Sequence, residues 1–146
     1  MNILILNGVN LNLQGKREPA KYGSVSFDDF LKKLRKMYPS LTIDYLQSNE
    51  ESVLVEKIQQ SENKYNGIIL NAGAFTHTSI AIADAIRSVC VSVVEVHITN
   101  IYARETYRKK SYLSEVCKGC ICGFGLDAYR LAIESFLKYS ENLYEI

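Results

Sequence analysis

Short, almost wholly apolar segments alternate along this chain with longer segments of helical periodicity. Residues 3–7, 67–71 and 91–97 have the length and the continuous apolar character of strands that are buried on both faces. Between them, apolar residues recur at the spacing that places them on one face of a helix. This alternation predicts right-handed βαβ crossovers, and therefore a parallel sheet covered by helices on both faces.

Two further segments complete a five-stranded sheet. Residues 41–45 alternate apolar and polar side chains, which favours a strand at a sheet edge, and residues 119–123 form the last predicted strand. The strand order 2-1-3-4-5 puts the alternating segment at an edge. Because 146 residues are the usual length of one domain, we predict a single flavodoxin-like, doubly wound α/β domain over residues 1–146.

Serines mark the expected starts of three helices. Ser26 and Ser48 each have an acidic residue three positions on, the spacing of a capping box, and Ser79 can cap a third helix with its hydroxyl. The last helix is predicted over residues 127–139.

The charge balance and the apolar pattern argue against several classes of protein. Seventeen Lys and Arg residues against sixteen Asp and Glu leave a net charge of +1, whereas nucleic-acid binding relies on a surplus of basic side chains. The longest stretch without charged side chains, residues 65–83, is too polar to span a membrane. The first residues lack the basic segment of an export signal, so we expect a cytoplasmic protein with reduced cysteines.

The loops at the carboxyl ends of the strands are the expected ligand site. In doubly wound sheets, ligands bind there, at the switch point between the first and third strands. The loops fall at residues 7–23, 71–79 and 97–108, and they contain both histidines of the chain, His77 and His97.

Glu95 and His97 lie two positions apart on a predicted strand, so their side chains point to the same face. The carboxylate can then fix the tautomer and orientation of the imidazole, an arrangement typical of a general acid or base. A structural ion pair accounts for the same spacing equally well.

Two loop features also have a chemical and a structural interpretation. Arg17 is close enough in sequence to Tyr22 for its guanidinium to stabilise a tyrosinate base, in a glycine-containing loop that can close over a site, although this feature alone favours a mobile surface loop. Arg104 and Arg108 would face the same way on a helix and could hold a carboxylate or a polyol. The structural alternatives are a surface loop for the first pair and a solvated turn for the second.

Two segments match part of a known binding motif, but the rest of the sequence does not supply what each motif requires. Cys117, Cys120 and Cys122 resemble half of a zinc site, but no second half exists, so small buried hydrophobic residues are favoured. The Gly-x-Gly-x-x-Ala segment at residues 123–128 matches a dinucleotide fingerprint, but too few residues follow it for the strand that this fold requires.

Taken together, these segments resemble type II 3-dehydroquinate dehydratase, the small dehydroquinase of the shikimate and quinate pathways. The resemblance covers essentially the whole chain and implies a lyase that removes water from 3-dehydroquinate to give 3-dehydroshikimate. It also implies that the enzyme needs no cofactor or metal and forms a dodecamer, a tetramer of trimers. The matching stretches are Ile5-Leu-Asn-Gly-Val-Asn-Leu-Asn, Arg17-Glu-Pro-x-x-Tyr22-Gly, Asn71-Ala-Gly-Ala-Phe-Thr-His77-Thr-Ser, Glu95-Val-His97-Ile-Thr-Asn100 and Ala103-Arg-Glu.

The resemblance implies a role for each matched residue. Tyr22 would be the general base, held as a phenolate by Arg17, and Asn10 would hold a water that stabilises the enolate oxygen. His97, oriented by Glu95, would protonate the departing hydroxyl. The residues implied in substrate binding are Asn71, Ile98 and Thr99 for the carboxylate, His77 and Arg108 for the ring hydroxyls, Arg104 at the site edge, and Asp84 from a neighbouring subunit.

Three departures from the family pattern leave these groups in place. Val9 and Ala72 stand where proline is usual or frequent, which should slightly loosen the loops, and Thr99 replaces the commoner serine but keeps the hydroxyl. The rival interpretation is a flavodoxin-fold ligand-binding or receiver-like module without dehydratase activity. A receiver needs acidic residues at the strand ends, where this chain has Asn7 and Asn71.

Overall fold

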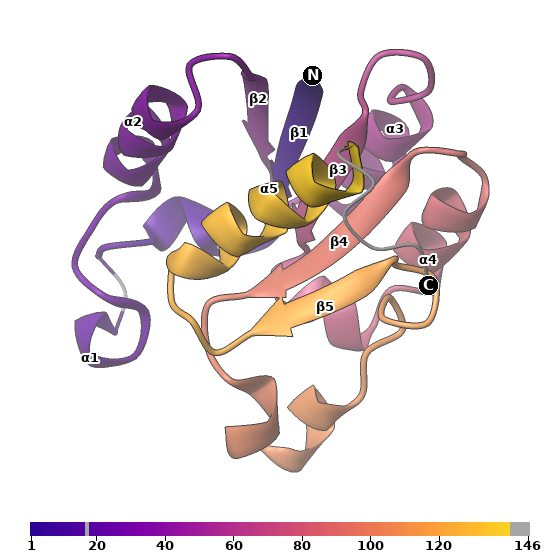
Figure 1. The fold of residues 1–146 in the computed structure, drawn as a ribbon. Coiled ribbons are helices and arrows are strands. Elements are labelled where there is room, and N and C mark those ends of the chain that lie inside the picture. The colour runs from indigo at the N-terminus through magenta and orange to yellow at the C-terminus, as the bar shows by residue number, and fades with distance from the viewer. Residues whose placement is uncertain (17, 141–146) are drawn as a thin grey trace.

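A five-stranded parallel sheet forms the centre of the molecule (Figure 1). The computed structural model describes residues 1–16 and 18–140, without the side chains of Pro19, Tyr22 and residues 138–140. The strand order β2-β1-β3-β4-β5 confirms the predicted fold class and puts β2 at an edge. The strands are β1 (Asn2–Asn7), β2 (Thr42–Gln47), β3 (Gly67–Asn71), β4 (Ser92–His97) and β5 (Gly119–Cys122).

Helices cover both faces of the sheet, because successive residues of each strand point to opposite sides. Ile3 and Ile5 pack on one side with residues of α2 (Phe27–Met37) and α5 (Asp127–Ser140). Leu4 and Leu6 pack on the other side, with residues of α3 (Glu51–Gln59) and α4 (Ile80–Arg87), as Figure 1 shows. Within the described residues, no helix has the combination of length and apolar character that crossing a bilayer requires.

Two of the three predicted helix caps are confirmed. Ser26 and Ser79 each accept a hydrogen bond from the backbone N–H three positions on, at the starts of α2 and α4. The prediction for Ser48 is wrong, because α3 is preceded by Glu50 at its cap position. The Ser48 hydroxyl accepts instead from the backbone N–H of Glu50 at 3.0 Å, so it closes a turn before the helix begins.

Short helical segments shape the loops beyond the carboxyl ends of β1, β3 and β4. They are η1 (Leu11–Leu13) and α1 (Pro19–Tyr22) after β1, η2 (Gly73–His77) after β3, and η3 (Ile101–Ala103) and η4 (Thr106–Lys109) after β4.

The loops after β1 and β3 contact each other through two glycines. The Gly8 N–H donates to the carbonyl oxygen of Asn71 at 2.7 Å, and a Cβ on Gly8 would lie 2.3 Å from the carbonyl oxygen of Ala72. Gly73 has a φ of +62°, and a Cβ there would lie 2.6 Å from the carbonyl oxygen of Val9. Glycine therefore allows the two loops to meet at the switch point.

Gly8→Ala is expected to destabilise the fold by about 3 kcal/mol, since the new methyl group meets backbone that cannot move aside. Urea denaturation measures this free energy of unfolding. Gly119→Ala is the matched control, because a Cβ on Gly119 meets nothing within 4 Å. Equal stability of the two variants would contradict the close contact.

Candidate active site

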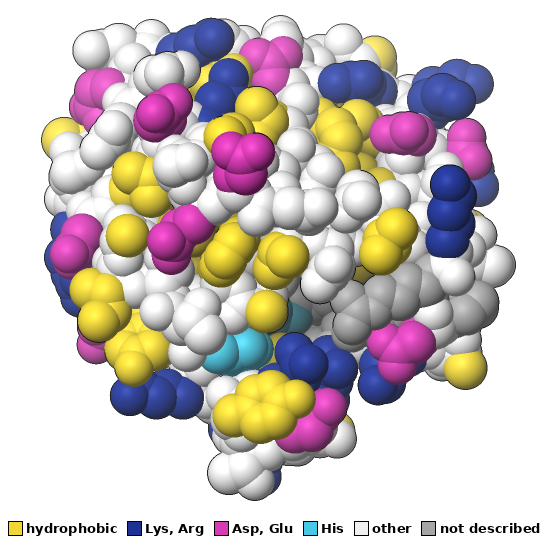
Figure 2. Space-filling view, turned by 180° about the vertical axis from the view of Figure 1, so that it is seen from behind, with side chains coloured by type: hydrophobic (Ala, Val, Ile, Leu, Met, Phe, Trp, Pro, Cys, Tyr) yellow, Lys and Arg dark blue, Asp and Glu magenta, His cyan; other side chains and the backbone are white. Residues whose placement is uncertain are grey.

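The carboxyl ends of β1, β3 and β4 open into one cleft, at the edge of the sheet predicted from the fold. Figure 2 shows the histidine side chains at a hollow, beside a group of Lys and Arg side chains. Eight of the predicted site residues line this cleft: Asn10, Asn71, His77, His97, Ile98, Thr99, Arg104 and Arg108.

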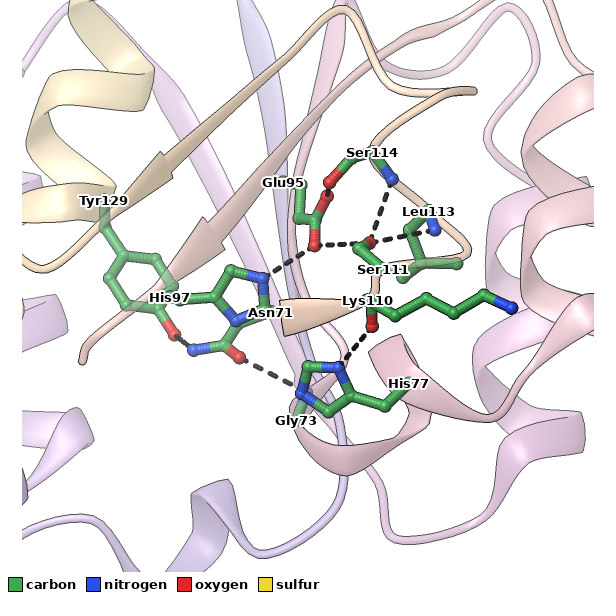
Figure 3. A network of polar contacts seen from close by, with 10 residues as sticks. All are labelled: Asn71, Gly73, His77, Glu95, His97, Lys110, Ser111, Leu113, Ser114 and Tyr129. Carbon is green, nitrogen blue, oxygen red and sulfur yellow. Dashed lines mark hydrogen bonds and ion pairs between the residues drawn. The ribbon is translucent and has the colours of Figure 1, made fainter. Parts of the chain in front are cut away.

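Glu95 and His97 form a buried pair at the end of β4 (Figure 3). His97 Nε2 lies 2.6 Å from Glu95 Oε1. The Glu95 carboxylate also accepts from the hydroxyls of Ser111 at 2.9 Å and Ser114 at 2.5 Å. Burial alone would raise the pKa of Glu95, but the hydrogen bonds from His97, Ser114 and Ser111 hold that pKa below its usual value. Glu95 is therefore an anion that orients His97.

The two histidine rings present different nitrogens to the cleft. Since Glu95 accepts the Nε2–H of His97, Nδ1 is the nitrogen of His97 left to exchange a proton with a ligand. His77 Nδ1 lies 2.7 Å from the carbonyl oxygen of Lys110 and must donate to it, which leaves Nε2 of His77 as an acceptor. The rings are nearly parallel, with centroids 6.4 Å apart.

A buried tyrosine fixes the side-chain amide of Asn71. Asn71 Nδ2 donates to the Tyr129 hydroxyl at 2.9 Å, and this hydroxyl donates to Asn7 Oδ1 at 2.8 Å. The backbone N–H of Gly73 donates to Asn71 Oδ1 at 3.2 Å (Figure 3). Burial raises the pKa of Tyr129 well above its usual value, so the hydroxyl keeps its proton. The second N–H of Asn71 remains for a ligand in the cleft.

Two guanidinium groups give the cleft a positive edge. Arg104 Nη1 donates to Thr99 Oγ1 at 3.3 Å, and Arg108 Nε donates to Glu105 Oε2 at 2.9 Å. Because the Thr99 hydroxyl accepts from Arg104, its own proton can be donated to a ligand. The cleft therefore suits an anionic ligand that also carries hydroxyl groups.

The sequence matches the model of a known family, Dehydroquinase class II, over residues 1–137. The chain belongs to this family. It is therefore an enzyme of the hydro-lyase class.

Individual class II dehydroquinases resemble the chain over nearly its full length. The 3-dehydroquinate dehydratase of Pelodictyon phaeoclathratiforme is 50% identical over 139 residues, which cover 94% of this chain and 92% of the relative. That of Clostridium botulinum strain Hall is 51% identical over 138 residues, which cover 93% of this chain and 94% of the relative. The crystal structure of type II dehydroquinase from Butyrivibrio crossotus superposes with a TM-score of 0.90 at 39% identity, covering 94% of this chain and 97% of that one.

Four predicted site residues of this class II dehydroquinase are not among the described residues that line the cleft. Arg17 lies outside the described residues, as does the side chain of Tyr22, whose backbone ends α1. Asp84 is exposed on α4, where its carboxylate pairs with Arg87 at 2.9 Å. Glu95 does not line the cleft but is buried beside it, hydrogen-bonded to His97, which does.

Sequence reasoning missed the residues that hold this dehydroquinase's polar groups in place. Ser111 and Ser114 reach Glu95 from a loop, and nothing in their spacing indicates a partner. Tyr129 did carry a signal, since it lies among the apolar residues of α5, and a buried tyrosine hydroxyl usually finds a hydrogen-bond partner.

The prediction of buried cysteines in this dehydroquinase is wrong for Cys120, which is exposed, while Cys117 and Cys122 are partly buried. The physical reason is that β5 is the edge strand of the described sheet, so Cys120 has a neighbouring strand on one side only. What burial remains, together with the nearby charge of Glu95, raises the pKa of Cys117 and of Cys120 to about 12.

Proposed function

We propose that this class II dehydroquinase removes water from 3-dehydroquinate to give 3-dehydroshikimate through an enolate intermediate. The observation that carries the proposal is the Glu95–His97 pair, which presents an imidazole to a cleft with a positive edge. The names of the close relatives supply the substrate. The anionic, hydroxylated character of 3-dehydroquinate suits the groups that line the cleft.

The first proposed step is removal of a proton from C2, next to the ketone, by Tyr22. Arg17 keeps Tyr22 in its phenolate form, and the electrons of the broken C–H bond pass to the ketone oxygen as an enolate. Asn10, which lines the cleft, holds a water that donates to this oxygen. Stabilising the enolate lowers the barrier because the charge appears only as the proton leaves.

In the second proposed step, His97 protonates the hydroxyl on C1, which leaves as water. The enolate electrons then form the double bond between C1 and C2, conjugated with the restored ketone. Glu95 keeps the ring oriented throughout, as a hydrogen-bonded carboxylate does for a catalytic histidine. Proton exchange with solvent returns His97 and Tyr22 to their starting states.

Substrate binding follows from the polar groups of the three loops. We propose that the carboxylate of the substrate accepts from Asn71 Nδ2, from the Thr99 hydroxyl and from the backbone amides of Ile98 and Thr99. Nε2 of His77 accepts from one ring hydroxyl, and Arg108 donates to another. Arg104 closes the edge of the site next to Thr99.

The direct test is an assay of the purified protein with 3-dehydroquinate in the presence of a chelator. We expect ultraviolet absorbance to rise as the conjugated enone forms. Quinate is the matched control, since it has no ketone and cannot form the enolate. A folded protein that produces no enone from 3-dehydroquinate would refute the proposed function.

Tyr129→Phe is expected to raise KM about tenfold while kcat changes less than about threefold. The substitution removes one hydroxyl that orients Asn71, and a hydrogen bond to a charge-binding group is worth about 1.4 kcal/mol, or a factor of about ten in affinity. Steady-state kinetics measure the split. In Tyr65→Phe, the control, a hydroxyl bonded to Asp44 is lost and both constants should stay unchanged. A lower apparent kcat at unchanged KM would mean only that less of the protein is correctly folded. Tyr129 would then support the fold and not substrate binding.

We also propose that the enzyme acts in the cytoplasm as a homo-oligomer, a dodecamer of four trimers. In that assembly, the exposed Asp84 of one subunit borders the site of the next. Light scattering on the purified enzyme measures its mass, and a monomer that is fully active would contradict the assembly.

A further inference from the structure

Three side chains of different chemistry converge behind the cleft, at the edge of the sheet. Cys120 on β5 lies opposite Glu95 on β4 in the strand register, which brings the thiol to the Glu95–His97 pair. One possible ligand atom from each of Glu95, His97 and Cys120 lies within 4.8 Å of the other two. Glu95 is fully buried and His97 is 6% exposed, whereas Cys120 is exposed. The cluster is therefore open to solvent on its thiol side.

A carboxylate, an imidazole and a thiolate are the three ligand types that zinc prefers in proteins. Around a tetrahedral Zn²⁺, ligand distances of about 2.0–2.3 Å place the ligand atoms about 3.4–3.6 Å apart. The ligand atoms of the cluster lie within 4.8 Å of one another, which is close to this size. Glu95 Oε1 and His97 Nε2, which lie 2.6 Å apart, would have to separate for an ion to bind between them. A carboxylate and a thiolate also supply the two negative charges that balance a divalent cation.

We propose that Glu95, His97 and Cys120 bind a soft divalent cation such as Zn²⁺ or Cd²⁺, and that the bound ion inhibits the enzyme. On binding, the Cys120 thiol releases its proton to solvent and forms a metal–sulfur bond. Glu95 supplies an oxygen, and His97 binds as a neutral ring with its proton on the other nitrogen. The ion thus occupies the ring nitrogen that carries the second proton of the imidazolium. His97 needs this positively charged form to act as an acid. The inhibition rests on the proposed function, whereas the binding does not.

Titration of the chelator-treated enzyme with Cd²⁺ tests the binding. We expect an ultraviolet thiolate-to-cadmium charge-transfer band that saturates at one ion per chain. Loss of a residue that merely supports a metal ligand costs roughly 10–100-fold in affinity, so Cys120→Ser should weaken Cd²⁺ binding by at least about 100-fold. Cys90→Ser, which removes another exposed thiol, should leave the titration unchanged.

Activity measured in the same titration tests the inhibition. We expect turnover of 3-dehydroquinate to fall as the absorption band rises, to recover on adding chelator, and to resist the same Cd²⁺ concentrations in Cys120→Ser. A band that is equal in Cys120→Ser and the unmodified enzyme, or absent from both, would overturn the site. A full band with undiminished turnover would overturn the inhibition. An enzyme that shows the band but never dehydrates 3-dehydroquinate would refute the proposed function and leave the metal site standing.

Discussion

Replacing His97 with glutamine is expected to lower kcat by about 1,000-fold, because a positioned general acid contributes roughly 10²–10⁴-fold to a reaction rate. Glutamine keeps an N–H that can donate to the buried Glu95 carboxylate, but it has no proton to transfer to a leaving hydroxyl. The enone assay measures kcat. His97→Ala should lose as much turnover, and it should also lose stability, since it leaves Glu95 charged, buried and short of one donor.

Isotope exchange separates the acid step from the proton removal that precedes it. In deuterated water, His97→Gln should still incorporate deuterium at C2 of the recovered 3-dehydroquinate, because the proposed base is intact. Turnover within tenfold of the unmodified enzyme, in a variant that unfolds at the usual temperature, would show that His97 is not the acid.

Tyr22→Phe is expected to abolish both the dehydration and the exchange of the C2 proton with solvent. The substitution removes only a hydroxyl oxygen, so the fold should persist while kcat falls by about 1,000-fold or more. Without a base, the C2 proton stays in place, and the recovered substrate should carry no deuterium. The circular dichroism spectrum and the unfolding temperature of the variant verify that the fold is retained.

The contrast between the two variants is the decisive result. Deuterium incorporation in His97→Gln but not in Tyr22→Phe would support a base and an acid on separate side chains. Normal incorporation in Tyr22→Phe would show that the base is another residue, and the role proposed for Arg17 would fail with it.

Local patterns in the sequence were sufficient to predict the strand order and the place of the cleft. Buried parallel strands are short and apolar throughout, and an edge strand alternates, so residues 41–45 could be placed beside the first strand. The pairing of Glu95 with His97 followed from the alternation of side chains along one strand. These features depend on neighbours close in sequence, or on rules that hold for the whole fold class.

Features that depend on contacts between distant segments escaped prediction. Ser48 has the spacing of a helix cap, yet its hydroxyl closes a turn instead. Cys120 is exposed because β5 is the edge strand of the described sheet, and the spacing of the cysteines does not indicate whether another element covers that strand. The partners of Glu95 on the loop at Ser111 and Ser114 are 16 and 19 positions away, and no periodicity connects them.

The hydrogen bond between Tyr129 and Asn7 joins residues 122 positions apart, and this has a consequence for synthesis on the ribosome. A nascent chain that has not yet exposed residues 127–140 lacks the hydroxyl that orients Asn71. The part of the cleft that Asn71 lines therefore takes its final shape only after α5 has left the ribosome, and a nascent chain that stops short of α5 has an incomplete cleft.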